Sequence, residues 1–335
     1  MMRMRTVMPT DTMPDFAQGT TSLREASIAP SSGGLLLAPA EVLMIGLTVA
    51  VGLLSFVLAT AYEQAVAWNT FLISFAPSAG LILLGCYVRA KKNMPRAAMA
   101  AIGAGIYIGF SGVIAILIYL RFPFNAPMID TQLMQLDAAL FGYSWEGFTT
   151  AMAAYPALGK AIGFIYGTSL AQLFAVIFVL GFMGRIVDLH RLLITGIVSL
   201  LLAVAFWWVW PSIGPSAYVA LPADVETALG LVHGEAEGNK LMQMATGGVP
   251  LITPEIIMGT IAFPSYHTVM LCLSVFFVWG TWAFWPLAVL NVGMLPSILS
   301  HGGHHVSDIL GGGAVFGLAL WIAIKLVPRP DQRAA

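Results

Sequence analysis

The chain has 335 residues, of which 59% are hydrophobic and only 9% are charged. A soluble domain carries about 25% charged residues, so this composition excludes an ordinary water-exposed surface and indicates an integral membrane protein. The formal net charge is -1, a balance that gives no indication of nucleic acid as a partner.

Residues 1–40 carry charges among Pro, Ser, Thr and Gly without an apolar run, which predicts a flexible tail. After the tail, apolar runs alternate with short polar breaks, and a membrane span needs about 20 residues. Each run is continuously apolar, which favours helices over the alternating strands of a barrel. The sequence therefore predicts an all-α, polytopic membrane helical bundle of about eight spans: residues 42–62, 68–88, 97–120, 160–183, 192–210, 265–283, 285–300 and 306–327.

Basic residues cluster on one side of this predicted topology. Twelve of the 15 Lys and Arg residues lie in the two tails, at the end of the last span, or in the breaks after the second and fourth spans. The positive-inside rule assigns that side to the cytoplasm, so both termini, including the short tail 328–335, are expected there. Two long, mainly acidic connections, residues 121–159 and 211–264, fall on the opposite side. Apolar residues at helical spacing in 128–142 predict a short interfacial helix.

Four of the six histidines lie in two short segments that flank the sixth and seventh spans, FPSYHTVM and SHGGHHVSDILGG. The topology brings both segments to the same non-cytoplasmic face. We therefore expect His267 and the group His301, His304 and His305 to face one site. The remaining two histidines, His190 and His233, are interpreted as packed structural residues.

The spacing of His304 and Asp308 indicates a defined chemistry. Residues four apart lie one turn apart on the same helix face, where an aspartate can orient an imidazole. Holding one ring nitrogen as N–H leaves a lone pair on the other, as a nucleophile or general base requires. His267, near another helix start, is then a candidate to protonate the leaving oxygen.

The residues around these histidines suit an anion. Ser265 precedes His267 at a predicted helix start, where unpaired backbone N–H groups favour phosphate oxygens. Gly302 and Gly303 allow the backbone to approach a ligand closely.

These motifs resemble those of the type 2 phosphatidic acid phosphatase (PAP2) superfamily. The segment PSYH resembles its second motif, and Ser297, Gly302, His304 and Asp308 match the spacing of its third. The resemblance implies that His304 is a phosphohistidine nucleophile oriented by Asp308, and that His267 is the acid for the leaving alcohol. It further implies Ser265 as a phosphate ligand and a reaction that requires no metal or other cofactor.

Two departures from the pattern remove expected phosphate-binding charges. The arginine of the third motif is Ile298, and the lysine and Arg-Pro of the first motif are replaced by PSIGPSAY at residues 211–218. Arg121 and Lys240 are the candidates in the outward-facing loops to balance a substrate phosphate. His301 is expected to line the same pocket, and His305 to lie behind the nucleophile.

Further elements are similar to the inositol phosphorylceramide synthase-like branch of the superfamily. These are Gly214, Pro215 and Tyr218 in a Gly-Pro-x-x-Tyr element, and LDAALFG at residues 136–142. The resemblance covers residues 97–327 as a six-helix core and leaves residues 41–96 as two additional spans. Tyr218 is carried over as a candidate substrate-binding residue.

The leading hypothesis is an integral-membrane phosphotransferase or phosphatase that acts on a lipid phosphate or phospholipid headgroup, with a small alcohol or water as acceptor. Two alternatives remain open. His301, His304 and Asp308 form a common zinc ligand set. A non-enzymatic transporter could use the same histidines to relay protons.

Overall fold

The computed structural model describes residues 36–329, and nearly all of them belong to one unit that begins at Leu37. The predicted tail 1–40 lies almost wholly outside the described residues, as does most of the tail 328–335. Within residues 36–329 there are thirteen α-helices and two short 3-10 helices, and the β-structure there is a single bridge between Val66 and Ile252. The predicted all-α fold is confirmed.

Each of the eight predicted spans corresponds to helix. Five helices are long and apolar enough to cross a membrane: α1 (Pro39–Ala61), α2 (Trp68–Lys91), α3 (Pro95–Tyr119), α8 (Ile186–Val209) and α13 (Val306–Leu326). The fourth predicted span is a pair, α6 (Pro156–Gly167) and α7 (Ser169–Phe182), bent by 51° at Thr168. The sixth and seventh are the shorter helices α11 (Tyr266–Phe276) and α12 (Phe284–Ser300).

Proline sets the start of several of these helices. Helix α1 begins at Pro39, α3 at Pro95 and α6 at Pro156, so a proline occupies the first helical position of each. Proline suits that position because its fixed φ is helical and its missing N–H would have no intrahelical partner. The polar breaks seen in the sequence therefore become helix boundaries.

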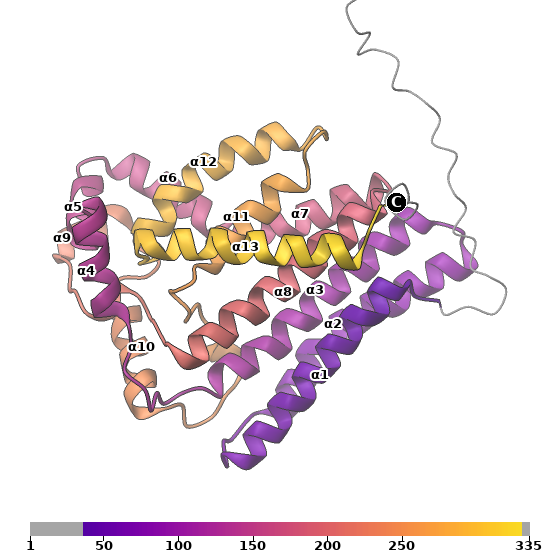
Figure 1. Ribbon diagram of the computed structural model, residues 1–335, viewed down its shortest axis with the longest axis horizontal. Coiled ribbons are helices and arrows are strands. Elements are labelled where there is room, and N and C mark those ends of the chain that lie inside the picture. The colour runs from indigo at the N-terminus through magenta and orange to yellow at the C-terminus, as the bar shows by residue number, and fades with distance from the viewer. Residues whose placement is uncertain (1–35, 330–335) are drawn as a thin grey trace, which may run out of the picture. The chain divides into compact units, whose positions relative to one another are not determined.

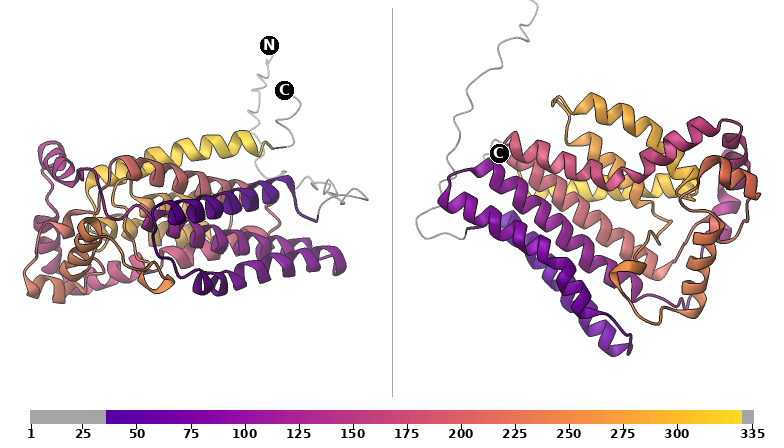
Figure 2. Two further views of the ribbon diagram at one scale, coloured as in Figure 1. Left: turned by 90° about the horizontal axis from the view of Figure 1, so that it is seen from below. Right: turned by 180° about the vertical axis from the view of Figure 1, so that it is seen from behind.

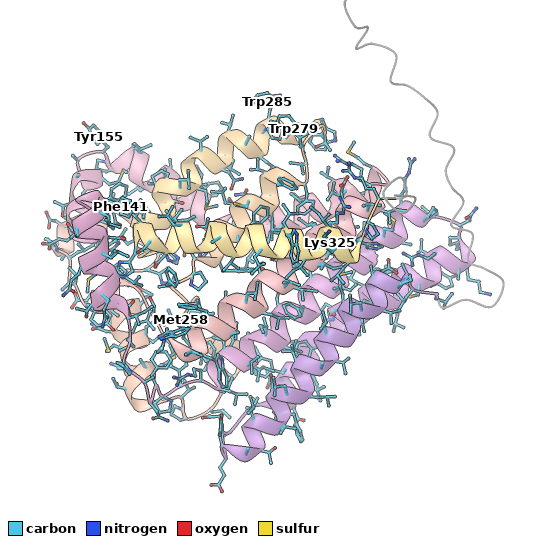
Figure 3. All side chains as sticks on the ribbon, viewed as in Figure 1. Phe141, Tyr155, Met258, Trp279, Trp285 and Lys325 are labelled. Carbon is cyan, nitrogen blue, oxygen red and sulfur yellow. The ribbon has the colours of Figure 1, made fainter. Side chains whose placement is uncertain are left out.

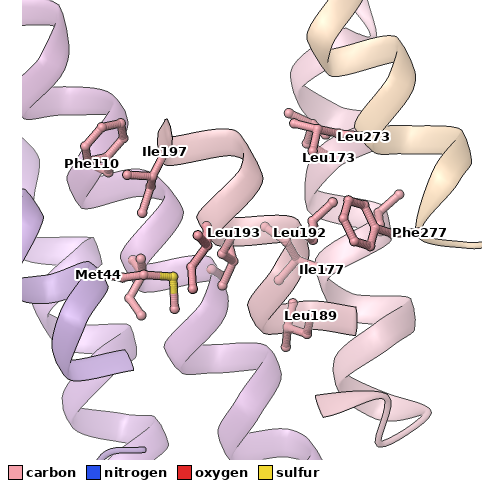
Figure 4. Packing of buried hydrophobic residues seen from close by; sticks show 14 of the residues in the cluster. Met44, Phe110, Leu173, Ile177, Leu189, Leu192, Leu193, Ile197, Leu273 and Phe277 are labelled. Atoms are coloured by element: carbon pink, nitrogen blue, oxygen red, sulfur yellow. The ribbon is translucent and has the colours of Figure 1, made fainter. Parts of the chain in front are cut away.

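Helices α3 and α8 form the centre of the bundle. The most apolar stretches of α3 and α8 are 61% and 56% buried, against 22% for α1 and 17% for both α2 and α13. Figure 4 shows Phe110 of α3 beside Ile197 of α8, and Leu193 of α8 beside Met44 of α1, with Ile177 of α7 and Phe277 beyond α11 in the same cluster. The outer helices therefore present apolar side chains to lipid.

Aromatic side chains mark one outer edge of the bundle. Trp279 and Trp285, near the turn between α11 and α12, are 68% and 72% exposed, and Figure 3 shows them projecting outward. Exposed tryptophans of this kind are typical of the boundary between lipid and water.

The bundle has two chemically different ends. At the first, which we call the basic end, Arg89 at the end of α2 pairs with Glu41 at the start of α1 (2.8 Å), and Arg191 of α8 donates to the carbonyl of Val327 (2.8 Å). The other, the histidine end, carries short helices: α4 (Asp130–Phe141), α5 (Trp145–Ala153), α9 (Ala223–Leu229) and α10 (Glu235–Gly247). Figures 1 and 2 show these short helices gathered away from the C-terminal end of α13. The predicted interfacial helix corresponds to α4.

Candidate active site

The two histidine segments meet where α11 and α13 begin. Ser265 is the N-cap of α11 and accepts a hydrogen bond from Thr268 N (3.4 Å), while its own N–H donates to the carbonyl of Asp308 (3.0 Å). The helices approach so closely here that a Cβ on Gly312 would lie 2.4 Å from the carbonyl oxygen of Ser265. Glycine at this position therefore allows the two motif segments to touch.

His304 and Asp308 form the pair that their spacing predicts. The His304 Nδ1 and Asp308 Oδ2 atoms lie 2.9 Å apart, and the side chains are only 3% and 0% exposed. The same carboxylate oxygen accepts the N–H of His305 (2.9 Å), which is the N-cap of α13. A carboxylate so fixed holds Nδ1 as the protonated nitrogen and leaves Nε2 with its lone pair.

His267 lies beside His304 across a small gap. Their ring centroids are 5.9 Å apart at an interplanar angle of 68°. On its other side, His267 stacks on Tyr166 of α6 with centroids 4.3 Å apart, and its Nδ1 lies 3.3 Å from the Tyr166 hydroxyl. A hydroxyl both donates and accepts, so Tyr166 suits either protonation state of this imidazole.

These side chains line one cavity that also reaches the long acidic connection. Three of its lining residues are histidines, two of them from the predicted segments and the third His233. The lining residues are Tyr166, Ile213, His233, Leu241, Gly259, Thr260, Ile261, Ala262, His267, Gly302 and His304. No lysine or arginine stands among these residues, so imidazoles are their basic side chains.

Two buried aspartates of α4 hold the segments that surround the cavity. Asp130 accepts hydrogen bonds from Gly214 N (2.8 Å), Ser212 Oγ (2.8 Å), Ile213 N and the hydroxyl of Tyr218 (3.2 Å). It is fully buried. The segment that replaces the expected first motif is therefore fixed through its backbone by a carboxylate.

Asp137, two turns along the same helix, caps α13. Its carboxylate accepts the N–H of Val306, the N–H of Ser307 (3.1 Å) and the Ser307 hydroxyl (2.7 Å). The N-terminus of α13 follows His304 and His305 directly, so Asp137 fixes the backbone beside His304. Tyr143, just after α4, donates to the carbonyl of His304 (3.1 Å).

The other predicted site residues differ in where they lie. Gly302 lines the cavity, whereas Gly303, with φ +57°, follows it in the backbone turn toward His304. Ser265 is fully buried and occupied by the cap of α11. Tyr218 binds Asp130 rather than lining the cavity, and it also contacts the sulfur of Met128.

His301 points away from the cavity. Its Nδ1 lies 2.9 Å from Ser300 Oγ and its Nε2 lies 3.4 Å from the carbonyl of Leu229. Burial lowers the pKa of this imidazole, although the contact with Leu229 partly opposes the shift. The ligand set His301, His304 and Asp308 is therefore not assembled, and residues 36–329 hold no group of three or more His, Cys, Asp or Glu side chains placed to bind a metal ion.

The two predicted cations lie outside the cavity lining. Arg121 donates from Nε to the carbonyl of Trp208 (2.8 Å), and its guanidinium lies 5.2 Å from the ring centroid of Phe124. The side chain of Lys240 on α10 is exposed. The structure brings neither of them to His304.

His305 faces the α4 carboxylates instead of the cavity. Its Nε2 lies 3.8 Å from Asp130 Oδ1. Burial disfavours the charged imidazole, yet Asp130, with Asp308 and Asp137 nearby, outweighs burial and raises the pKa of His305 above its usual range. His305 thus lies outside the cavity lining, and its expected place behind His304 stays a prediction.

Sequence reasoning did not single out four residues of the site: Tyr166, His233, Asp130 and Asp137. The aspartates carried a usable signal, because charges seven residues apart on a short helix share one face. Tyr166 and His233 carried none, since each stands alone among residues that share no motif with it.

Comparison with known protein families gives a match over more than half of the chain. The family model described as the PAP2 superfamily matches residues 131–322, from the start of α4 to near the end of α13. No curated protein matches the chain, and no solved structure does.

Proposed function

The chain belongs to the PAP2 superfamily, and from that premise we propose that it moves a phosphoryl group or phospho-headgroup from a membrane lipid to an alcohol or water through a phosphohistidine at His304. The observation that carries the proposal is the His304–Asp308 pair at 2.9 Å with the His267 ring next to it in one cavity. Membership of the superfamily supports a membrane phosphatase or phosphotransferase in general. The intermediate, the lipid and the acceptor are the further steps of the proposal.

The first half-reaction uses the free nitrogen of His304. Asp308 accepts a hydrogen bond from Nδ1–H, so Nδ1 keeps its proton while the Nε2 lone pair attacks phosphorus and forms the P–N bond. The bond from phosphorus to the leaving oxygen breaks, and that oxygen keeps the electron pair. Protonated His267 gives it the proton, while the Tyr166 hydroxyl remains hydrogen-bonded to the other ring nitrogen.

The second half-reaction runs in reverse order. Neutral His267 removes the proton from an alcohol or water, whose oxygen attacks phosphorus. The P–N bond breaks and its electron pair returns to His304 Nε2. The choice between alcohol and water decides between transferase and hydrolase.

The apolar surroundings of the histidine site support a lipid as the donor. Tyr266, which directly precedes His267, lies among buried apolar side chains of α3, α7 and α8, such as Ile106, Leu173 and Leu192. The void between these side chains has room for only about one or two water molecules, so it does not hold an acyl chain as it stands.

The transferase form is favoured by the elements of the inositol phosphorylceramide synthase-like branch. Each of the two elements supplies a partner in the α4 network: LDAALFG contains Asp137, and the Gly-Pro-x-x-Tyr element contains Gly214 and Tyr218, both bound to Asp130. We therefore favour a small alcohol over water as the acceptor.

The sidedness of the proposed site follows from the two ends of the bundle. The basic end collects the residues that the positive-inside rule assigns to the cytoplasm. The histidine end is the opposite one, so the proposed reaction takes place on the non-cytoplasmic face with both termini in the cytoplasm.

The test is to trap the phosphoenzyme. Purified protein incubated with ³²P-labelled lipid phosphates should acquire a label that is labile to acid and stable to base, as expected for phosphohistidine. His304→Gln should lose both the label and the turnover, whereas His190→Gln, a matched change at the basic end, should keep both. Normal turnover by the His304→Gln protein would overturn the proposal. The absence of both label and turnover in the wild type would instead favour the alternative, a non-enzymatic transporter that uses the same histidines.

A further inference from the structure

His233 is the one histidine outside the recognised motifs that reaches the cavity. Its backbone N–H donates to the carbonyl of His301 (3.1 Å), which fastens the loop between α9 and α10 to the third-motif segment. Its ring meets Tyr166 edge to face, with centroids 6.1 Å apart at 86°, and lines the cavity with His267 and His304. In the part of the chain that the structure describes, no side-chain hydrogen bond occupies its ring nitrogens.

A bound phosphate would bring unbalanced negative charge into this cavity. A phosphate monoester carries about -1.5 to -2 at neutral pH. The lining residues include no lysine or arginine, Arg121 is engaged by Trp208, and Lys240 is exposed elsewhere. In the proposed reaction, His304 forms the covalent bond and His267 moves the proton. His233 is then the basic side chain of the lining that has no other role.

We propose that His233 binds the phosphate in this cavity and adds a second positive charge to that of protonated His267. The inference rests on the proposed function, because it assumes that a phosphate reaches His304.

The protonation of the His233 ring is coupled to phosphate binding. Burial, and then the nearby imidazole of His304, lower the pKa of His233 to about 4, with Glu237 of α10 opposing the shift. The groups that face it are His304 before α13, His267 of α11, Tyr166 of α6 and Glu237. In the empty cavity the ring is thus neutral at pH 6–8. A phosphate within about 4–6 Å favours the imidazolium form, so binding takes up a proton.

The experiment measures inorganic phosphate binding to the full chain in lipid nanodiscs by titration calorimetry. Heats in two buffers of different ionisation enthalpy give the number of protons taken up. For His233→Gln at pH 6 we expect phosphate to bind about 10- to 100-fold more weakly, the range for one hydrogen bond to a charged group, with a smaller proton uptake on binding. His233→Lys should keep the affinity with the smaller proton uptake, because its charge is present before phosphate binds. His190→Gln should match the wild type.

Phosphate affinity and proton uptake unchanged in His233→Gln would overturn the inference, and so would a fall in kcat with both quantities intact. Sulfate keeps its charge between pH 8 and pH 6, so wild-type affinity for sulfate that fails to tighten over this range would also overturn the inference, without relying on any variant to fold. The two proposals fail separately. If His304→Gln loses turnover while phosphate binding ignores His233, the phosphohistidine reaction stands and only the role of His233 is wrong.

Discussion

At the basic end, buried Glu41 is paired with the guanidinium of Arg89, whereas at the histidine end Asp130, Asp137 and Asp308 bind backbone N–H groups, hydroxyls and imidazoles. A guanidinium keeps its charge at every accessible pH, so the pairs at the basic end are fixed. An imidazole changes its charge near neutral pH. Carboxylates satisfied mainly by backbone donors leave the imidazoles free to gain and lose protons. Buried carboxylates therefore hold two helices together at the basic end. At the histidine end they set the tautomer and the charge of imidazoles.

The largest expected difference between the two ends appears when one carboxylate at each end is changed to an amide. Asp308→Asn should lower kcat by about 10³- to 10⁴-fold, because an amide no longer holds the tautomer that leaves a lone pair on His304 Nε2. Asp188→Asn, which weakens the pairs with Arg185 and Arg329 at the basic end, should leave kcat unchanged. Steady-state kinetics on both proteins in detergent micelles decides the matter. Turnover above a tenth of wild type in Asp308→Asn would contradict the assigned role.

The next largest effect concerns positioning. Asp137→Ala leaves the N–H groups of Val306 and Ser307 without their acceptor, so unfolding should become easier by about 2–4 kcal/mol. Turnover per folded molecule should fall by about 10- to 100-fold, since small displacements of reacting groups are costly. Thermal unfolding followed by near-UV circular dichroism and turnover at 20 °C give the two quantities. Asp224→Asn on the exposed face of α9 is the control, and equal behaviour of the two proteins would rule out this role for Asp137.

A third change tests the buried carboxylate of the basic end, Glu41. Glu41→Gln removes the charge that pairs with Arg89, which is 23% exposed. We expect a loss of about 1–2 kcal/mol in unfolding free energy, less than for a fully buried pair, because solvent reaches the arginine left behind. The kcat should stay at the wild-type value. A drop in kcat comparable with that of Asp137→Ala would show that the two ends are coupled.

The smallest expected effect is a pH dependence of stability. The raised pKa of His305 means that its charged form is favoured in the folded protein. The stabilisation is fully present below the unfolded pKa of about 6.5 and is lost as pH rises through the higher folded value. The difference in Tm between wild type and His305→Gln should therefore be larger at pH 6 than at pH 8.5. A difference that grows with pH would contradict the pairing of His305 with Asp130.

The all-helical membrane fold, the boundaries of most spans and the pairing of His304 with Asp308 could be predicted from the amino-acid sequence. These features depend on local physics: apolar run length, proline at helix starts and the four-residue repeat of a helix. The other side chains that meet His304 and Asp308 depend on how distant segments pack, which local patterns do not specify. Tyr166 and His233 reach the cavity from positions 138 and 71 residues before His304, a distance along the chain that no periodicity spans. Arg121 and Lys240 have the right charge and lie on the predicted non-cytoplasmic side. Packing nevertheless directs Arg121 to the carbonyl of Trp208. The charge of a side chain indicates what it can bind, but the backbone decides where it points.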